Sequence, residues 1–145
     1  MKKYELTNET KTLAGGTVLH RIRALRDIPR FGVKAGELGG FVEEENNLSQ
    51  DGIAWVFDNA EVSGNAKVSA SSDYMVIKNI WSSGRWFTYT RSNKKWAVGC
   101  FYGTGEELVA KAYKDSELSG RCYEAIVRAV ETIEAAEAEA KGETK

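Results

Sequence analysis

The residue types that most often carry out chemistry are scarce in this chain. It has 145 residues, with His20 as its one histidine and Cys100 and Cys122 as its cysteines. A histidine can act as a general base, and a cysteine can act as a nucleophile or a metal ligand. The separations among the three match no metal-ligand spacing. We therefore predict no metal, no cofactor and no catalytic residue, with both cysteines as buried small residues.

A stretch rich in aromatic and basic residues is the sharper candidate for binding. Aromatic side chains on a sheet can stack on bases while flanking basic residues hold phosphates, which leaves single-stranded nucleic-acid binding open. Protein binding is favoured, because Trp, Tyr and Arg dominate interface hot spots. About half of the aromatic residues are expected to pack inward. The candidate partner-binding residues are Arg85, Trp86, Tyr89, Arg91, Lys94 and Lys95.

Acidic residues form a second candidate surface. Read structurally, they are a solvated face; read functionally, they could imitate a phosphate backbone and occupy a basic groove on another protein. The net charge of −1 weakens mimicry, since a mimic should be strongly acidic overall. We keep both interpretations. The acidic candidates for partner binding are Glu43, Glu44, Glu45, Asp58 and Glu61.

Charge and hydrophobic patterning limit the cellular context. The near-neutral net charge argues against general polyanion binding, so nucleic acid is a disfavoured partner. No apolar run approaches the length of a membrane span, and the first residues lack an apolar signal core. Two cysteines do not make a disulfide framework. We predict a protein of the cytoplasm, in a host cell, with no membrane partner.

An internal repeat lies in the middle of the chain. Val56, Val62 and Val68 recur every six residues, and so do Ala60 and Ala66. A period of six fits neither a helix nor a flat strand; it is typical of hexapeptide coils, in which each turn points aliphatic and small residues inward. The regular part amounts to about one coil within residues 38–70. Such a coil needs caps, from the N-terminal strands, the rest of the chain or a partner copy, so homo-oligomers are compatible with it.

The remaining patterns predict the other elements. Residues 4–7 and 17–25 read as strands that could pair as a hairpin. Residues 74–81, 85–91 and 95–102 read as a three-stranded antiparallel meander. Thr104 and Glu107 form a capping box, which opens the first of two amphipathic helices. The predicted fold class is mainly β plus α+β: a hexapeptide-type β-helical unit over 1–70, then a β-β-β-α-α unit over 71–145 with both helices on one face of the meander.

Several motifs occur in an order that suggests a family. The motifs are Gly39-Gly40-Phe41-Val42, Asn47-Leu48-Ser49, Trp55 to Ala60, Val62 to Val68, and Val98 to Thr104. The chain resembles phage and prophage proteins with left-handed β-helix repeats, often described as hexapeptide-transferase-like. The resemblance implies a phage or prophage origin and carries no agreed activity. Acyltransferases of this class have a long trimeric prism, a groove between coils and a histidine base. His20 precedes the coil, so we expect no enzyme.

These observations lead to three functional hypotheses. The main one is a non-catalytic protein-binding protein of phage type, most concretely a counter-defence inhibitor that binds a host protein such as a CRISPR effector subunit. The first alternative is a hexapeptide acyltransferase-like protein that binds acyl-CoA and depends on His20. The second alternative is single-stranded nucleic-acid binding through Arg85 and Trp86.

Overall fold

The chain forms two compact units in the computed structural model, Met1–Gly103 and Thr104–Lys145. The structure describes residues 2–13, 15–81, 84–99 and 101–142. The unit boundary expected near residue 70 lies inside the first of these units. Helices and sheets are both present, so the fold is mixed α and β with two four-stranded sheets.

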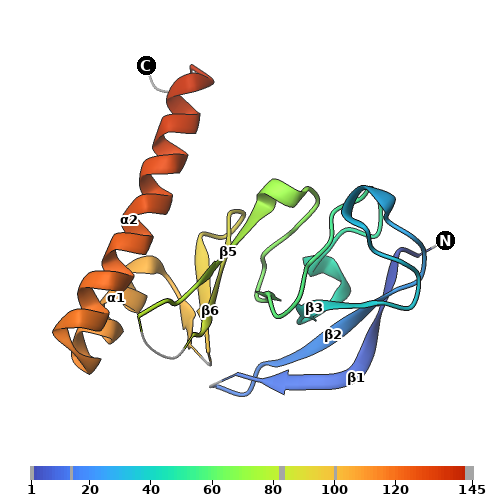
Figure 1. The fold of residues 1–145 in the computed structure, drawn as a ribbon, viewed down its shortest axis with the longest axis horizontal. Helices are drawn as coiled ribbons and strands as arrows, with labels where there is room; N and C mark the ends of the chain where they lie inside the picture. Colours follow the sequence, from blue (N-terminus) through green and yellow to red (C-terminus); the bar gives the residue numbers. More distant parts are fainter. Residues whose placement is uncertain (1, 14, 82–83, 100, 143–145) are drawn as a thin grey trace. The chain divides into compact units, whose positions relative to one another are not determined.

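The first sheet contains four strands in the order β1-β2-β3-β4. The strands are β1 (Tyr4–Thr12), β2 (Val18–Ala24), β3 (Leu38–Val42) and β4 (Glu61–Val62). β1 and β2 pair antiparallel from Tyr4↔Ala24 to Thr12↔Val18, so the predicted hairpin is confirmed (Figure 1). β2 also pairs antiparallel with β3, whereas β3 pairs parallel with β4.

The parallel pairing brings the chain back alongside itself after a fixed interval. Phe41 pairs with Glu61, Val42 with Val62, and Leu48 with Val68, so each pair is offset by 20 residues (61 minus 41, 62 minus 42, 68 minus 48). We call the stretch of chain between paired residues, from Phe41 to Val68, the circuit. It includes the short 3₁₀ helix Glu45–Asn47. All five repeat residues are at most 1% exposed and belong to one hydrophobic core: Val56, Ala60, Val62, Ala66 and Val68.

The two faces of the first sheet bury different residues. Side chains of residues that pair across neighbouring strands point to the same face. Ile22 and Val42 belong to the core that holds the repeat. Leu19 and Phe41 face the other way and form a smaller core with Leu13, against which Tyr102 packs. This second face of the first sheet packs against Tyr102, and the site described below lies on the same face.

Two glycines let β3 approach the circuit closely. A Cβ at Gly39 would lie 2.6 Å from the Val56 carbonyl oxygen, and a Cβ at Gly40 would lie 2.6 Å from that of Ala60. Gly40 N donates to Val56 O at 2.7 Å, and Phe41 N donates to Ala60 O at 2.9 Å. The backbones therefore touch where any side chain would separate them.

The second sheet has four strands where the sequence predicted three. The order is β5 (Tyr74–Lys78), β6 (Trp86–Thr90), β7 (Lys95–Val98) and β8 (Phe101–Gly103), all antiparallel. The predicted third strand, 95–102, is wrong because Gly99 has a φ of 57° and turns the chain between β7 and β8. Cys100 lies outside the described residues. Two further 3₁₀ helices, Pro29–Phe31 and Ser71–Asp73, lie in connections of this unit.

The second unit is a pair of helices, α1 (Gly105–Asp115) and α2 (Glu117–Ala140). The predicted capping box is confirmed: Glu107 N donates to the Thr104 hydroxyl at 3.2 Å, and Thr104 N donates to a Glu107 carboxylate oxygen at 2.9 Å. Ser116 ends α1 and caps α2. Gly120 sits directly against the Tyr113 ring, so α1 and α2 approach closely there. The placement of both helices on one face of the second sheet stays a prediction.

Candidate functional site

A cleft of about 340 Å³ lies on the second face of the first sheet. Its residues come from β1, β2, β3, β4, the loop before β4, and the adjoining ends of β6 and β7. Strands of both sheets therefore contribute, and all of them belong to the first compact unit. The lining residues are Lys11, Arg21, Phe41, Asn59, Glu61, Arg85, Trp86 and Gly99.

One row of paired residues forms the floor of the cleft. Arg21 pairs with Phe41 across β2 and β3, and Phe41 pairs with Glu61 across β3 and β4, so the three side chains share a face. The Arg21 guanidinium lies 4.3 Å from the centre of the Phe41 ring, a cation–π arrangement. Arg21 also donates to Gly39 O at 2.7 Å and to Glu9 Oε2 at 2.8 Å. Arg21 is thus fixed in place by the protein itself.

Glu61 is a buried carboxylate with one unused oxygen. Its side chain is 6% exposed. Lys11 Nζ donates to Oε2, whereas Oε1 has no hydrogen-bond partner among the described residues. Burial raises the pKa of Glu61 above its usual range, although the hydrogen bond and charge of Lys11 act in the opposite direction. Glu61 N donates to the Thr88 hydroxyl at 3.0 Å, which ties β4 to β6.

Arg85 and Trp86 form the outer wall. Phe87 pairs with Val98, so the residues just before Phe87 and just after Val98 meet at one end of the β6–β7 hairpin. A Cβ at Gly99 would lie 3.5 Å from Arg85 Nη1, an ordinary van der Waals distance, so the guanidinium lies directly against this glycine. Within the described residues the Arg85 side chain makes no hydrogen bond or ion pair. The Trp86 side chain is 41% exposed.

His20 lies on the opposite face of the first sheet from this cleft. It pairs with Val42 in β3 and with Thr10 in β1, and its side chain is half-buried. His20 Nδ1 lies 3.2 Å from Thr7 O. A backbone carbonyl can only accept, so the neutral ring carries its proton on Nδ1 and keeps a lone pair on Nε2. That tautomer is the one a general base needs at Nε2.

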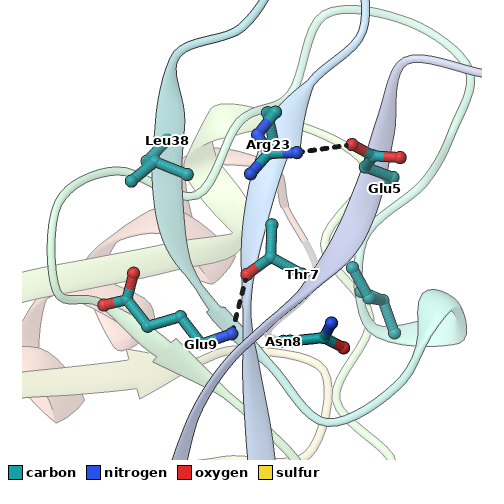
Figure 2. A pocket seen from close by; sticks show the side chains of 7 residues that line it. Glu5, Thr7, Asn8, Glu9, Arg23 and Leu38 are labelled. Atoms are coloured by element: carbon teal, nitrogen blue, oxygen red, sulfur yellow. Dashed lines mark hydrogen bonds and ion pairs between the residues drawn. The ribbon is translucent and has the colours of Figure 1, made fainter.

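A second hollow of about 440 Å³ lies where β1 loses register with β2 (Figure 2). The register shifts between Leu6 and Thr10. The charged groups here are already paired: Arg23 Nη1 donates to Glu5 Oε2 at 2.9 Å, and Glu9 binds Arg21. Glu9 N donates to the Thr7 hydroxyl at 3.3 Å. The remaining lining residues are Leu6, Asn8 and Leu38.

The structure brings only part of the predicted partner-binding set together. Arg85, Trp86 and Glu61 meet in the cleft. Tyr89, another candidate for partner binding, is 4% exposed, and its ring centre lies 4.8 Å from that of Trp96. Placed outside the cleft lining are Arg91, Lys94, Lys95, Glu43, Glu44, Glu45 and Asp58.

Several of the acidic candidates have structural partners. Glu43 Oε1 accepts from Gly64 N at 2.8 Å, and Glu45 binds Lys2 Nζ at 2.9 Å. The lysine beside Glu45 holds the pKa of that carboxyl below its usual range. Asp58 has a φ of 48° and occupies the turn before β4. These groups shape loops as well as presenting charge.

Sequence reasoning missed most of the cleft. Lys11, Arg21, Phe41, Asn59 and Gly99 belong to it and were not predicted. The alternation in residues 17–25 places Leu19 and Arg21 on one face, which was a usable signal. The register that adds Phe41 and Glu61 to that face required the structure.

The part of the chain that the structure describes has no candidate metal site and no candidate membrane span. No three His, Cys, Asp or Glu side chains gather there as ligands of one metal ion. Neither α1 nor α2, as far as they are described, combines the length and hydrophobicity that a membrane crossing requires. Cys122 is half-buried with a free thiol.

Comparison with known proteins gives one relevant similarity. The chain is 29% identical over 99 residues to a protein of Escherichia coli (strain K12) named "Uncharacterized acetyltransferase YdcK". The match covers 56% of this chain and 30% of that protein, so the chain spans less than a third of the relative's length. No family model matches the chain. No solved structure matches it significantly.

This similarity contradicts two expectations from the sequence. The main hypothesis was a non-catalytic counter-defence inhibitor of the anti-CRISPR kind, and the chain was expected not to be an enzyme. The relative is named as an acetyltransferase, which favours the acyltransferase-like alternative over both. The shortness of the repeat and the position of His20 before it argued against an enzyme, although the six-residue repeat itself is typical of hexapeptide acyltransferases.

Proposed function

We propose that this chain takes part in acyl transfer as a relative of hexapeptide-repeat acyltransferases. The observation that carries the proposal is the circuit, whose parallel pairs are offset by 20 residues and which is filled by Val56, Val62 and Val68 at six-residue spacing. This circuit is read as a short coil of the hexapeptide β-helix type. The similarity to a protein named as an acetyltransferase supports the same function.

His20 is the proposed general base. Its Nδ1–H bonds to Thr7 O, so Nε2 is free to take a proton from an amine or hydroxyl acceptor. The acceptor atom then attacks the thioester carbonyl of an acyl-CoA donor and the carbon–sulfur bond breaks. The imidazolium returns the proton to the leaving thiolate. The products are the acylated acceptor and coenzyme A, and no further reactant is needed.

The shortness of the circuit indicates that further copies or coils are needed to cover its core. β4 contains only two residues, so the parallel ladder offers little sheet to cover the end of the core. A second copy of the chain, or coils such as a longer relative could contribute, would extend the ladder and cover that end. We therefore propose that the active form is an oligomer.

The test is acyl transfer from acetyl-CoA to a panel of small amines and alcohols, followed by mass spectrometry of both products. The wild-type chain is expected to release coenzyme A in proportion to the acylated acceptor. His20→Gln is expected to lower the rate by about 100-fold or more, in the range typical of lost general-base catalysis. Arg30→Gln, which changes an exposed residue of the Pro29–Phe31 turn, is the control and should leave the rate unchanged.

A further inference from the structure

We propose that the cleft between the two sheets of the first unit binds a nucleoside phosphate. In this arrangement Trp86 stacks on the ring, Arg85 holds the phosphate, and Glu61 Oε1 accepts a hydrogen bond from an N–H or O–H of the ligand. The inference rests on the cleft alone and goes beyond acyl transfer, since His20 lies on the other face of the sheet.

Arg85 supplies the charge that the cleft does not neutralise. Lys11 is paired with Glu61 and Arg21 with Glu9, so these four groups cancel in pairs. Arg85 is the lining cation whose side chain has no partner among the described residues. It packs on Gly99, where an added Cβ would lie 3.5 Å from Nη1. Arg is well suited to bidentate contact with phosphate.

Trp86 supplies the planar surface next to that cation. Trp86 is 41% exposed although it begins a strand in which the next four residues are buried. An aromatic face beside a guanidinium is the usual pairing for a base and its phosphate in single-nucleotide and single-strand sites. An anion without a ring would bind Arg85 but would leave the face of the Trp86 ring in water.

Glu61 supplies the directional contact. Its Oε1 is buried and has no partner in the described part of the chain, which is a costly state for a carboxylate oxygen. A base amine or a ribose hydroxyl would satisfy it. Burial raises the pKa of this group, while the paired Lys11 acts in the opposite direction. A ligand donor would therefore relieve a cost present in the free protein.

The size of the cleft limits the ligand to about one nucleotide. A volume of about 340 Å³ is at the lower end of the range for small-molecule sites. Successive bases of a long strand would need further exposed aromatic surfaces beside Trp86. The same group can come from a free nucleotide, from a nucleotide-containing coenzyme or from the end of a single strand, and the probes below separate these sources.

The experiment titrates the full chain by calorimetry with ADP, adenosine, pyrophosphate, coenzyme A and a short oligo(dA). ADP is expected to bind more tightly than either adenosine or pyrophosphate, because only ADP reaches both Trp86 and Arg85. Trp86→Leu should weaken ADP binding by about tenfold or more, whereas Trp86→Phe should keep most of it. Arg85→Gln should remove the advantage of ADP over adenosine. Arg30→Gln is the matched control at an exposed arginine outside the cleft.

The outcomes separate the sources and the two proposals. Tightest binding of coenzyme A, of ADP or of oligo(dA) each supports the cleft and identifies the source of the nucleotide. Equal binding of pyrophosphate and ADP, or ADP binding unchanged in both Trp86→Leu and Arg85→Gln, would overturn it. Because the Arg85 side chain has no partner among the described residues, Arg85→Gln should fold normally, which thermal unfolding checks. ADP binding without acyl transfer would sink only the acyl-transfer proposal.

Discussion

Buried polar side chains fix the loops around the first sheet. Lys3 is 0% exposed, and its Nζ donates to Ala54 O at 2.6 Å. Burial, followed by the nearby positive charge of Arg26, lowers the pKa of Lys3 to about 8. A charged amine is therefore buried against backbone carbonyls, which couples the folding of the chain to pH.

Because the Lys3 amine is buried, we predict that the free energy of unfolding of the chain rises at alkaline pH. The folded pKa of Lys3, about 8, lies below the ordinary value of 10.5, so the unfolded chain binds the proton more tightly between these two values. The free energy of unfolding contributed by Lys3 therefore rises with pH between about 8 and 10.5 and is level below about 8, where both states carry the proton. Urea unfolding at pH 7 and pH 9.5 should show this slope in the wild type and lose it in Lys3→Met. Equal slopes in both proteins would contradict the assignment.

We predict that truncating the Asn47 side chain strongly lowers the stability of the chain. Asn47 is 1% exposed, its amide donates to Ala66 O and Gly64 O, and its oxygen accepts from the amides of Glu43 and Glu44. Asn47→Ala should cost roughly 3 kcal/mol, because several buried backbone groups lose partners that each contribute about 1 kcal/mol. Asn46→Ala, at the exposed neighbouring position, should cost less than about 0.5 kcal/mol. Chemical denaturation measures both, and similar losses would refute the role of Asn47.

At the scale of the elements, periodicity predicted the strands and their antiparallel hairpins but not the parallel pairing of β3 with β4. The alternation in residues 17–25 and the capping box at Thr104 are local signals, and both elements form where they were expected. The break at Gly99 was missed because the apolar residues on both sides of it were read as one strand, although glycine is the residue that most readily adopts a positive φ. The cleft was missed because its residues run from Lys11 to Gly99, and only strand register brings them together.

We predict that a side chain added at a glycine of β3 overpacks the contact between β3 and the circuit. Gly40→Ala places a Cβ 2.6 Å from Ala60 O and 2.6 Å from Val56 Cγ1, and the carbonyl belongs to a backbone that pairs with β3. We expect a loss of about 2–3 kcal/mol of unfolding free energy. Leu38→Ala, at a 51% exposed position on the same strand, should cost under about 1 kcal/mol. Thermal and urea unfolding test this, and a neutral Gly40→Ala would show that the circuit is looser than described.

At the scale of the whole molecule, the six-residue repeat was predicted from the sequence, whereas the main hypothesis of a counter-defence inhibitor is contradicted by the similarity to a protein named as an acetyltransferase. The buried six-residue spacing places the repeat in the main core of the first unit. The helical pair, Thr104–Lys145, is a compact unit of its own, where the sequence placed the boundary near residue 70. The phage origin implied by the resemblance stays a prediction. Composition did not indicate acyl transfer, because the proposed mechanism uses a single histidine, His20.

The most direct test of the central claim is the ratio of coenzyme A release from acetyl-CoA by the wild-type chain and by His20→Gln, with Arg30→Gln alongside. If the chain transfers acyl groups with His20 as base, the wild type and Arg30→Gln turn over at equal rates and His20→Gln is slower by about 100-fold or more. Coenzyme A release by His20→Gln at the wild-type rate, or none above buffer from the wild type with any acceptor, would contradict the account.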